Sequence, residues 1–129
     1  MNTRVVTAEP PRVLVVEDDD ELRSLIGLAI ADAGYASVEA ADGVAALAAC
    51  AERDPDVILL DLAMPRLGGQ AFVNAYRRGL GRAKIIVTSG TTKAGEESAR
   101  MRASVFLSKP FVLDELLSAV KRVLNTTTA

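Results

Sequence analysis

The stretch "RVLVVEDDDELRSLI", residues 12–26, passes directly from an apolar run into five consecutive acidic residues. The apolar run is short and does not alternate with polar residues, which is typical of a strand covered on both faces of a parallel sheet. The acidic residues, 17–21, repel one another next to a strand that is expected to be buried. We therefore expect a positively charged partner to bind where this strand ends.

Short apolar runs alternate with amphipathic patterns along the rest of the chain. The other runs suited to strands are 36–40, which is weaker, and 56–60, 84–88 and 105–108. Helical spacing of apolar residues marks 22–30, which stops at Gly34, and then 44–51, 72–76, a poorly patterned 92–101, and 113–124. A strand followed by a helix, five times over, predicts a doubly wound α/β fold in which five helices cover a five-stranded parallel sheet with right-handed crossovers.

The composition excludes several classes of protein. A chain of 129 residues, 50% hydrophobic, fits one domain, which we expect over 11–124 between tails at 1–10 and 125–129. The net charge of −2 and the pI near 5.2 argue against nucleic-acid binding. No apolar run approaches the ~18 residues of a membrane span, and the N-terminus lacks the pattern of a signal peptide. Cys50 is the single cysteine, which excludes an internal disulfide and favours the cytoplasm.

The chain contains no histidine. This absence excludes serine–histidine triads, histidine zinc sites and histidine proton shuttles within the chain. Any histidine chemistry in the function must come from a partner.

Polar residues follow or end four of the expected strands. Because ligands of doubly wound folds bind at the carboxyl ends of the strands, we expect these residues to meet at one edge of the sheet. They are Glu17, Asp18, Asp61, Thr88 and Lys109. Magnesium is commonly bound by one or two carboxylates and several waters, so the acids of this set predict a Mg²⁺ site.

Each of these residues also has a structural explanation. Asp18 could cap the first helix, with Glu21 completing a capping box, although capping needs only one acid. Asp61 could form a turn, and Thr88 could simply end a strand. Lys109 could be solvated in front of a proline that suits the first turn of the next helix. Together, these explanations leave the carboxylates and the lysine at one edge unexplained.

The motifs "RVLVVEDDDELR", "ADGVAAL", "PDVILLDLAMPRLGG", "KIIVTSG" and "FLSKPF" resemble, in order and spacing, the successive signatures of bacterial response-regulator receiver domains. The resemblance covers residues 11–124 and implies the flavodoxin-like (βα)₅ fold. It also implies a two-component signalling protein, here of the stand-alone, chemotaxis type.

The resemblance assigns roles to the acidic residues. Asp61 matches the aspartate that accepts the phosphoryl group. Glu17 and Asp18 match the acidic pair that holds Mg²⁺ with Asp61, and Ala63 matches the position whose backbone carbonyl also binds the metal. Phosphoryl transfer depends mainly on positioning and charge neutralisation, which these groups would supply.

The resemblance also assigns the remaining residues of the site. Thr88 matches the hydroxyl that bonds the phosphoryl group, and Lys109 matches the cation that pairs with it, typically before a cis proline. Phe106 matches the aromatic residue that moves when the domain switches. The implied partners are a histidine kinase or a histidine phosphotransfer protein, and a target protein bound by the face of the fourth helix, fifth strand and fifth helix.

Two features depart from the pattern of the family, and both concern the fourth helix. Receivers commonly have Gly where Arg102 precedes Ala103, and the segment 88–109 is about one residue shorter than usual. The length and the order of the fourth helix therefore stay open.

Other functions fit the sequence less well. A phosphatase of the haloacid dehalogenase type could use Asp18 and Asp20, but Leu22 stands near the place of its usual Thr, and the chain is too short. A dinucleotide-binding domain would need a Gly-rich fingerprint after the first strand.

A receiver-like interaction module independent of phosphorylation would be expected to have lost an acid, the Thr or the Lys. A receiver fragment of a larger regulator or hybrid kinase is also compatible with the sequence. We expect no enzymatic activity beyond self-catalysed phosphotransfer and autodephosphorylation.

The resemblance makes one prediction about the lifetime of the signal. Hydrolysis of an aspartyl phosphate needs an oriented water. The two positions best placed to hold it with a side chain are occupied here by Ala63 and Gly90, neither of which has a polar side chain. Because orientation can be worth several kcal/mol, we expect slow self-dephosphorylation, and faster loss of phosphate in Ala63→Asn. Phosphate release at fixed Mg²⁺ measures both rates, and an unchanged or slower mutant would refute the orientation argument.

Overall fold

Five parallel strands form one sheet in the order β2-β1-β3-β4-β5. The structure is a computed structural model, and it describes residues 9–62, 64, 67–90 and 103–125. Each end of every strand lies within one residue of its predicted position. The strands are β1 (Arg12–Val16), β2 (Ala36–Ala40), β3 (Val57–Asp61), β4 (Lys84–Ser89) and β5 (Val105–Ser108).

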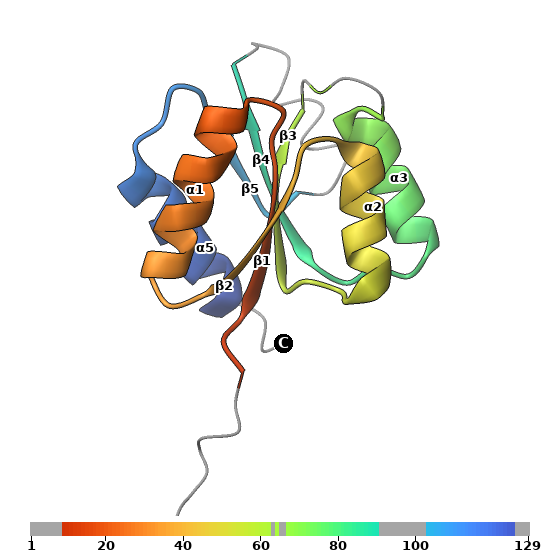
Figure 1. Ribbon diagram of the computed structural model, residues 1–129, viewed down its shortest axis with the longest axis horizontal. Helices are drawn as coiled ribbons and strands as arrows, with labels where there is room; N and C mark the ends of the chain where they lie inside the picture. The colour runs from red at the N-terminus through yellow and green to blue at the C-terminus, as the bar shows by residue number, and fades with distance from the viewer. Residues whose placement is uncertain (1–8, 63, 65–66, 91–102, 126–129) are drawn as a thin grey trace, which may run out of the picture.

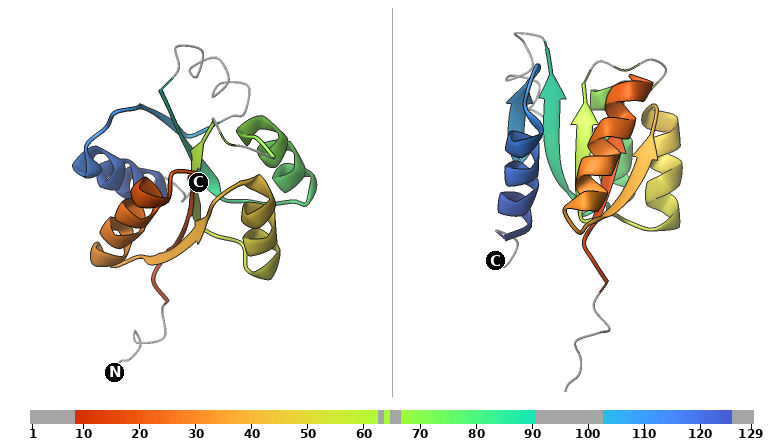
Figure 2. Two further views of the ribbon diagram at one scale, coloured as in Figure 1. Left: turned by 45° about the horizontal axis from the view of Figure 1, so that its top comes forward. Right: turned by 60° about the vertical axis from the view of Figure 1, so that its left-hand side comes forward.

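Helices cover both faces of the sheet, which gives three layers (Figures 1 and 2). One face carries α1 (Asp20–Asp32) and α5 (Leu113–Asn125), and the other carries α2 (Gly43–Glu52) and α3 (Gly69–Arg78). The flavodoxin-like fold class is confirmed. Within the described residues there are four helices, because the expected helix at 92–101 lies outside them. In that part of the chain no helix is long and apolar enough to cross a membrane.

The central strands β1, β3 and β4 are buried because successive side chains point to opposite faces of the sheet and helices cover both faces. In β1, Val13 and Val15 pack towards α1 and α5, whereas Leu14 and Val16 pack towards α2 and α3. The strands β3 and β4 repeat this division, so each face has its own apolar core. The two cores explain why the apolar runs are continuous rather than alternating.

Helix α1 begins at Asp20, one residue later than it would if Asp18 were its N-cap. Asp19 is the N-cap, and its carboxylate accepts a hydrogen bond from the Leu22 amide at 3.1 Å. The explanation with Asp18 as the cap and Glu21 completing the box is therefore wrong. At the other end, Gly34 follows the helix with a φ of 98°, as the sequence predicted for a stop.

Tyr76 connects the end of α3 to the loops at the amino ends of the strands. Its ring stacks on that of Phe72, and its hydroxyl donates to Asp54 Oδ1 and accepts from the Ala83 amide, both at 2.7 Å. Burial, and then the hydrogen bond to Asp54, raise the pKa of Tyr76. One hydroxyl thus satisfies a buried backbone amide far from the carboxyl ends of the strands.

We predict that Tyr76→Phe lowers the free energy of unfolding by about 1–3 kcal/mol, because the Ala83 amide stays buried without an acceptor. Urea denaturation measures the change. The matched control is Tyr35→Phe, since the hydroxyl of this half-buried tyrosine has no hydrogen bond within the described residues. An equal loss in both variants would show that the hydrogen bond does not matter.

Candidate metal centre

The parallel register brings the expected polar residues to the carboxyl edge of the sheet. Asp61, the last residue of β3, lies opposite Thr88 of β4. Glu17 directly follows β1, and Lys109 directly follows β5, where its amide donates to the Ser89 carbonyl at 2.9 Å. Residues far apart in the sequence therefore meet because their strands end together.

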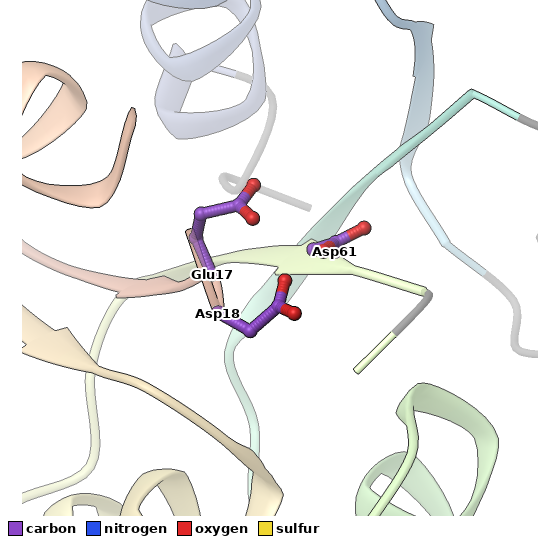
Figure 3. A group of neighbouring side chains, drawn as sticks. All are labelled: Glu17, Asp18 and Asp61. Atoms are coloured by element: carbon purple, nitrogen blue, oxygen red, sulfur yellow. The ribbon is translucent and has the colours of Figure 1, made fainter. Parts of the chain in front are cut away.

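Three carboxylates converge at this edge, as Figure 3 shows. Glu17, Asp18 and Asp61 each offer a carboxylate oxygen, and these atoms all lie within 4.8 Å of one another. Glu17 and Asp61 are buried, whereas Asp18 is exposed. The group lies between β1 and β3, where the strand order changes direction and where ligands of such sheets bind.

Lys109 supplies a positive charge to the same group. Its Nζ lies 2.8 Å from Glu17 Oε1 and 3.6 Å from Asp61 Oδ1. Burial alone would lower the pKa of Lys109, but the hydrogen bond to Glu17 and the charges of Asp61 and Glu17 outweigh it, so the pKa is raised. The peptide bond before Pro110 is cis, as the resemblance predicted. Since α5 begins only at Leu113, the proline does not occupy its first turn, and the structural explanation for this pair is wrong.

Every polar atom of Glu17 takes part in a hydrogen bond. Its amide donates to the Ala40 carbonyl at 3.1 Å, and its Oε2 accepts from the Asp19 amide at 3.1 Å. Lys109 holds Oε1, and Arg23 Nη1 donates to the Glu17 carbonyl at 2.9 Å. No motif of the sequence singled out Arg23, although it is the only basic residue between Arg12 and Arg53.

The other predicted residues differ in how the structure places them. Thr88 is buried in β4, and Phe106 is half-buried in β5 against the core beneath α2 and α3. Ala63 lies outside the described residues, and so does Arg102, which marked one departure from the family pattern.

The donor set fits a hard divalent cation. Carboxylate oxygens are the ligands that Mg²⁺ prefers, and an exposed Asp18 beside buried Glu17 and Asp61 leaves one side open to water. A cation would also offset the repulsion that one lysine cannot fully neutralise among three acids. The three carboxylates could therefore hold Mg²⁺.

The sequence of this chain is similar to those of known proteins. The model of the response regulator receiver domain family matches residues 13–121. The transcriptional regulatory protein PrrA of Mycobacterium tuberculosis is 36% identical over 117 residues, which are 89% of this chain and 50% of that protein. The response regulator MprA of Mycobacterium sp. (strain KMS) is 35% identical over 120 residues, 92% of this chain and 52% of that protein. The chain thus spans about half the length of these curated relatives.

Solved structures show the same fold. The receiver domain of the Francisella response regulator 1452 superposes with a TM-score of 0.84 at 29% identity, covering 92% of this chain and 99% of that one. The chemotaxis protein CheY4 of Vibrio cholerae gives a TM-score of 0.83 at 33% identity, covering 91% of this chain and 100% of that one. The matching family model, the relatives and the shared fold lead to one conclusion: this chain belongs to the family of response regulator receiver domains, which act in two-component signal transduction.

Proposed function

We propose that this receiver domain accepts a phosphoryl group on Asp61 from a phosphohistidine of a partner kinase or phosphotransfer protein. The observation that carries the proposal is the convergence of charged side chains at the carboxyl ends of the strands. Buried Asp61 has carboxylate oxygens of Glu17 and Asp18 within 4.8 Å, and Lys109 Nζ lies 3.6 Å from it. The chain has no histidine, so the donor must belong to the partner.

Each residue of the site would have a separate role in phosphoryl transfer. An oxygen of Asp61 would attack the phosphorus while the phosphorus–nitrogen bond breaks, and the imidazole would leave with the electron pair and take up a proton. The residues that would hold Mg²⁺ are Glu17, Asp18 and Asp61, together with the carbonyl of Ala63. The positive charge supplied there would offset the negative charge of the phosphoryl oxygens. Lys109 would pair with one of these oxygens, and the Thr88 hydroxyl would donate to another.

The proposed output is a change in a protein-binding face. Movement of Thr88 towards the phosphoryl group would make room for Phe106, which already packs partly against the core. This movement would alter the surface around β5 and α5, and with it the binding of a target protein. The chain would catalyse only its own phosphorylation and dephosphorylation.

Two alternatives concern the context in which the domain works. PrrA and MprA are about twice as long as this chain, which favours a receiver portion of a larger regulator or hybrid kinase. CheY4 is matched over its whole length, which favours a stand-alone regulator. A phosphorylation-independent interaction module is a third reading, and the intact set of acids, Thr88 and Lys109 counts against it.

The first test concerns the metal. At a Mg²⁺ concentration 100 times the dissociation constant, one bound ion should raise the free energy of unfolding by about 2.7 kcal/mol, and the melting temperature should rise with it. Asp18→Asn should lose this response, whereas Asp32→Asn, an exposed aspartate at the other end of α1, should keep it. A melting temperature that ignores Mg²⁺ in the unmodified protein would contradict the assignment.

The second test concerns the phosphoacceptor. Incubation with acetyl phosphate and Mg²⁺ should add one phosphoryl group, seen as a single increase in intact mass. Asp61→Asn should abolish the increase because the attacking carboxylate is lost, while Asp32→Asn should retain it. Equal phosphorylation of Asp61→Asn and the unmodified protein would place the acceptor elsewhere and reject the proposal.

A further inference from the structure

Arg23 of α1 contacts three separate parts of the chain. Its Nη1 donates to the Glu17 carbonyl at 2.9 Å, and its Nη2 donates to Asp20 Oδ1 at 2.7 Å. Its Nε lies 3.5 Å from Glu39 Oε1 of β2. The Arg23 side chain is only 16% exposed, so its position is set by packing as well as by charge. None of the roles proposed above uses this residue.

The carbonyl that Arg23 holds belongs to the peptide bond between two proposed metal ligands. The Glu17 carbonyl and the Asp18 amide form one planar unit. A hydrogen bond that sets the direction of this carbonyl therefore sets the plane of the whole peptide. That plane determines how the Glu17 and Asp18 side chains leave the backbone relative to each other. Arg23 thus acts on both carboxylates without touching either.

The Arg23 guanidinium also contacts β2, the strand at the edge of the sheet. Glu39 approaches it from β2, and Gly27 of α1 leaves the space that the Glu39 carboxylate occupies. A Cβ atom at position 27 would lie 2.6 Å from Glu39 Oε2. The packing of α1 on β2 therefore supports the position of Arg23, while Asp20 holds its other end.

We propose that Arg23 is a positioning residue that holds the Glu17–Asp18 peptide in the orientation needed for Mg²⁺ binding. The inference rests on the proposed function, because it concerns the metal site assigned there. The planar fork of the guanidinium is essential to it, since one nitrogen holds the carbonyl while the others hold carboxylates. A lysine carries the same charge but cannot make these contacts together.

Positioning and simple electrostatics predict opposite results. If Arg23 acted only through its charge, its removal would make the site more negative and Mg²⁺ would bind more tightly. If Arg23 positions the peptide, its removal should weaken binding, because metal sites commonly lose tenfold or more in affinity when a group that orients their ligands is removed. The sign of the change therefore separates the two roles.

Titration calorimetry with Mg²⁺ on the full chain provides the first measurement. We expect the dissociation constant to rise about tenfold in both Arg23→Gln and Arg23→Lys. Arg53→Gln is the matched control, because it removes the same charge from an exposed arginine that pairs with Glu9, and it should bind Mg²⁺ as the unmodified protein does. Tighter binding by Arg23→Gln, or unchanged binding by Arg23→Lys, would overturn the proposal. Arg23→Lys keeps the charge, so it serves alone if Arg23→Gln does not fold.

The second measurement needs no metal. In NMR spectra of the metal-free protein, loss of the hydrogen bond should shift the Glu17 carbonyl carbon and the Asp18 amide nitrogen in both Arg23 variants, but not in Arg53→Gln. Unchanged shifts would overturn the proposal. If the unmodified protein fails to bind Mg²⁺, the proposed metal site is wrong, and these shifts still decide whether Arg23 orients the peptide.

Discussion

The repulsion among three carboxylates is the constraint on which the rest of the structure depends. Glu17 directly follows β1 and Asp61 ends β3, and both residues are buried where these two paired strands end. Lys109 relieves part of this repulsion through the contact with Glu17 at 2.8 Å. A carboxylate buried without such a partner would be costly. The fold therefore brings together negative charges that would lie far apart in an unfolded chain. These charges make the carboxyl ends of the strands suitable for binding a cation.

The fold could be predicted from the sequence because burial on both faces of a strand leaves a clear pattern. The runs that form β1, β3 and β4 are continuously apolar, since both faces of these central strands are covered by helices. Strand β2 was the weakest prediction for a physical reason. It lies at the edge of the sheet, where most of its residues are only half-buried, so small and polar side chains are tolerated.

The site was predictable only where strand ends determine it. Asp61, Thr88 and Lys109 meet because parallel strands end at the same edge, and this follows from topology. The choice between Asp18 and Asp19 as the helix cap depends on where α1 starts, and a shift of one residue among consecutive acids leaves no mark in the sequence. The contact of Arg23 with the Glu17 carbonyl depends on how α1 turns back towards β1. Local spacing does not specify such a contact.

The bond between Lys109 and Glu17 joins groups 92 residues apart, and it has a consequence for synthesis of the chain. A ribosome delivers all three carboxylates well before it delivers β5 and the lysine that follows it. A nascent chain that has formed β1 and β3 therefore carries the acids without their internal counter-charge. Lys109 follows β5, so the complete charge arrangement exists only in a chain translated past this strand.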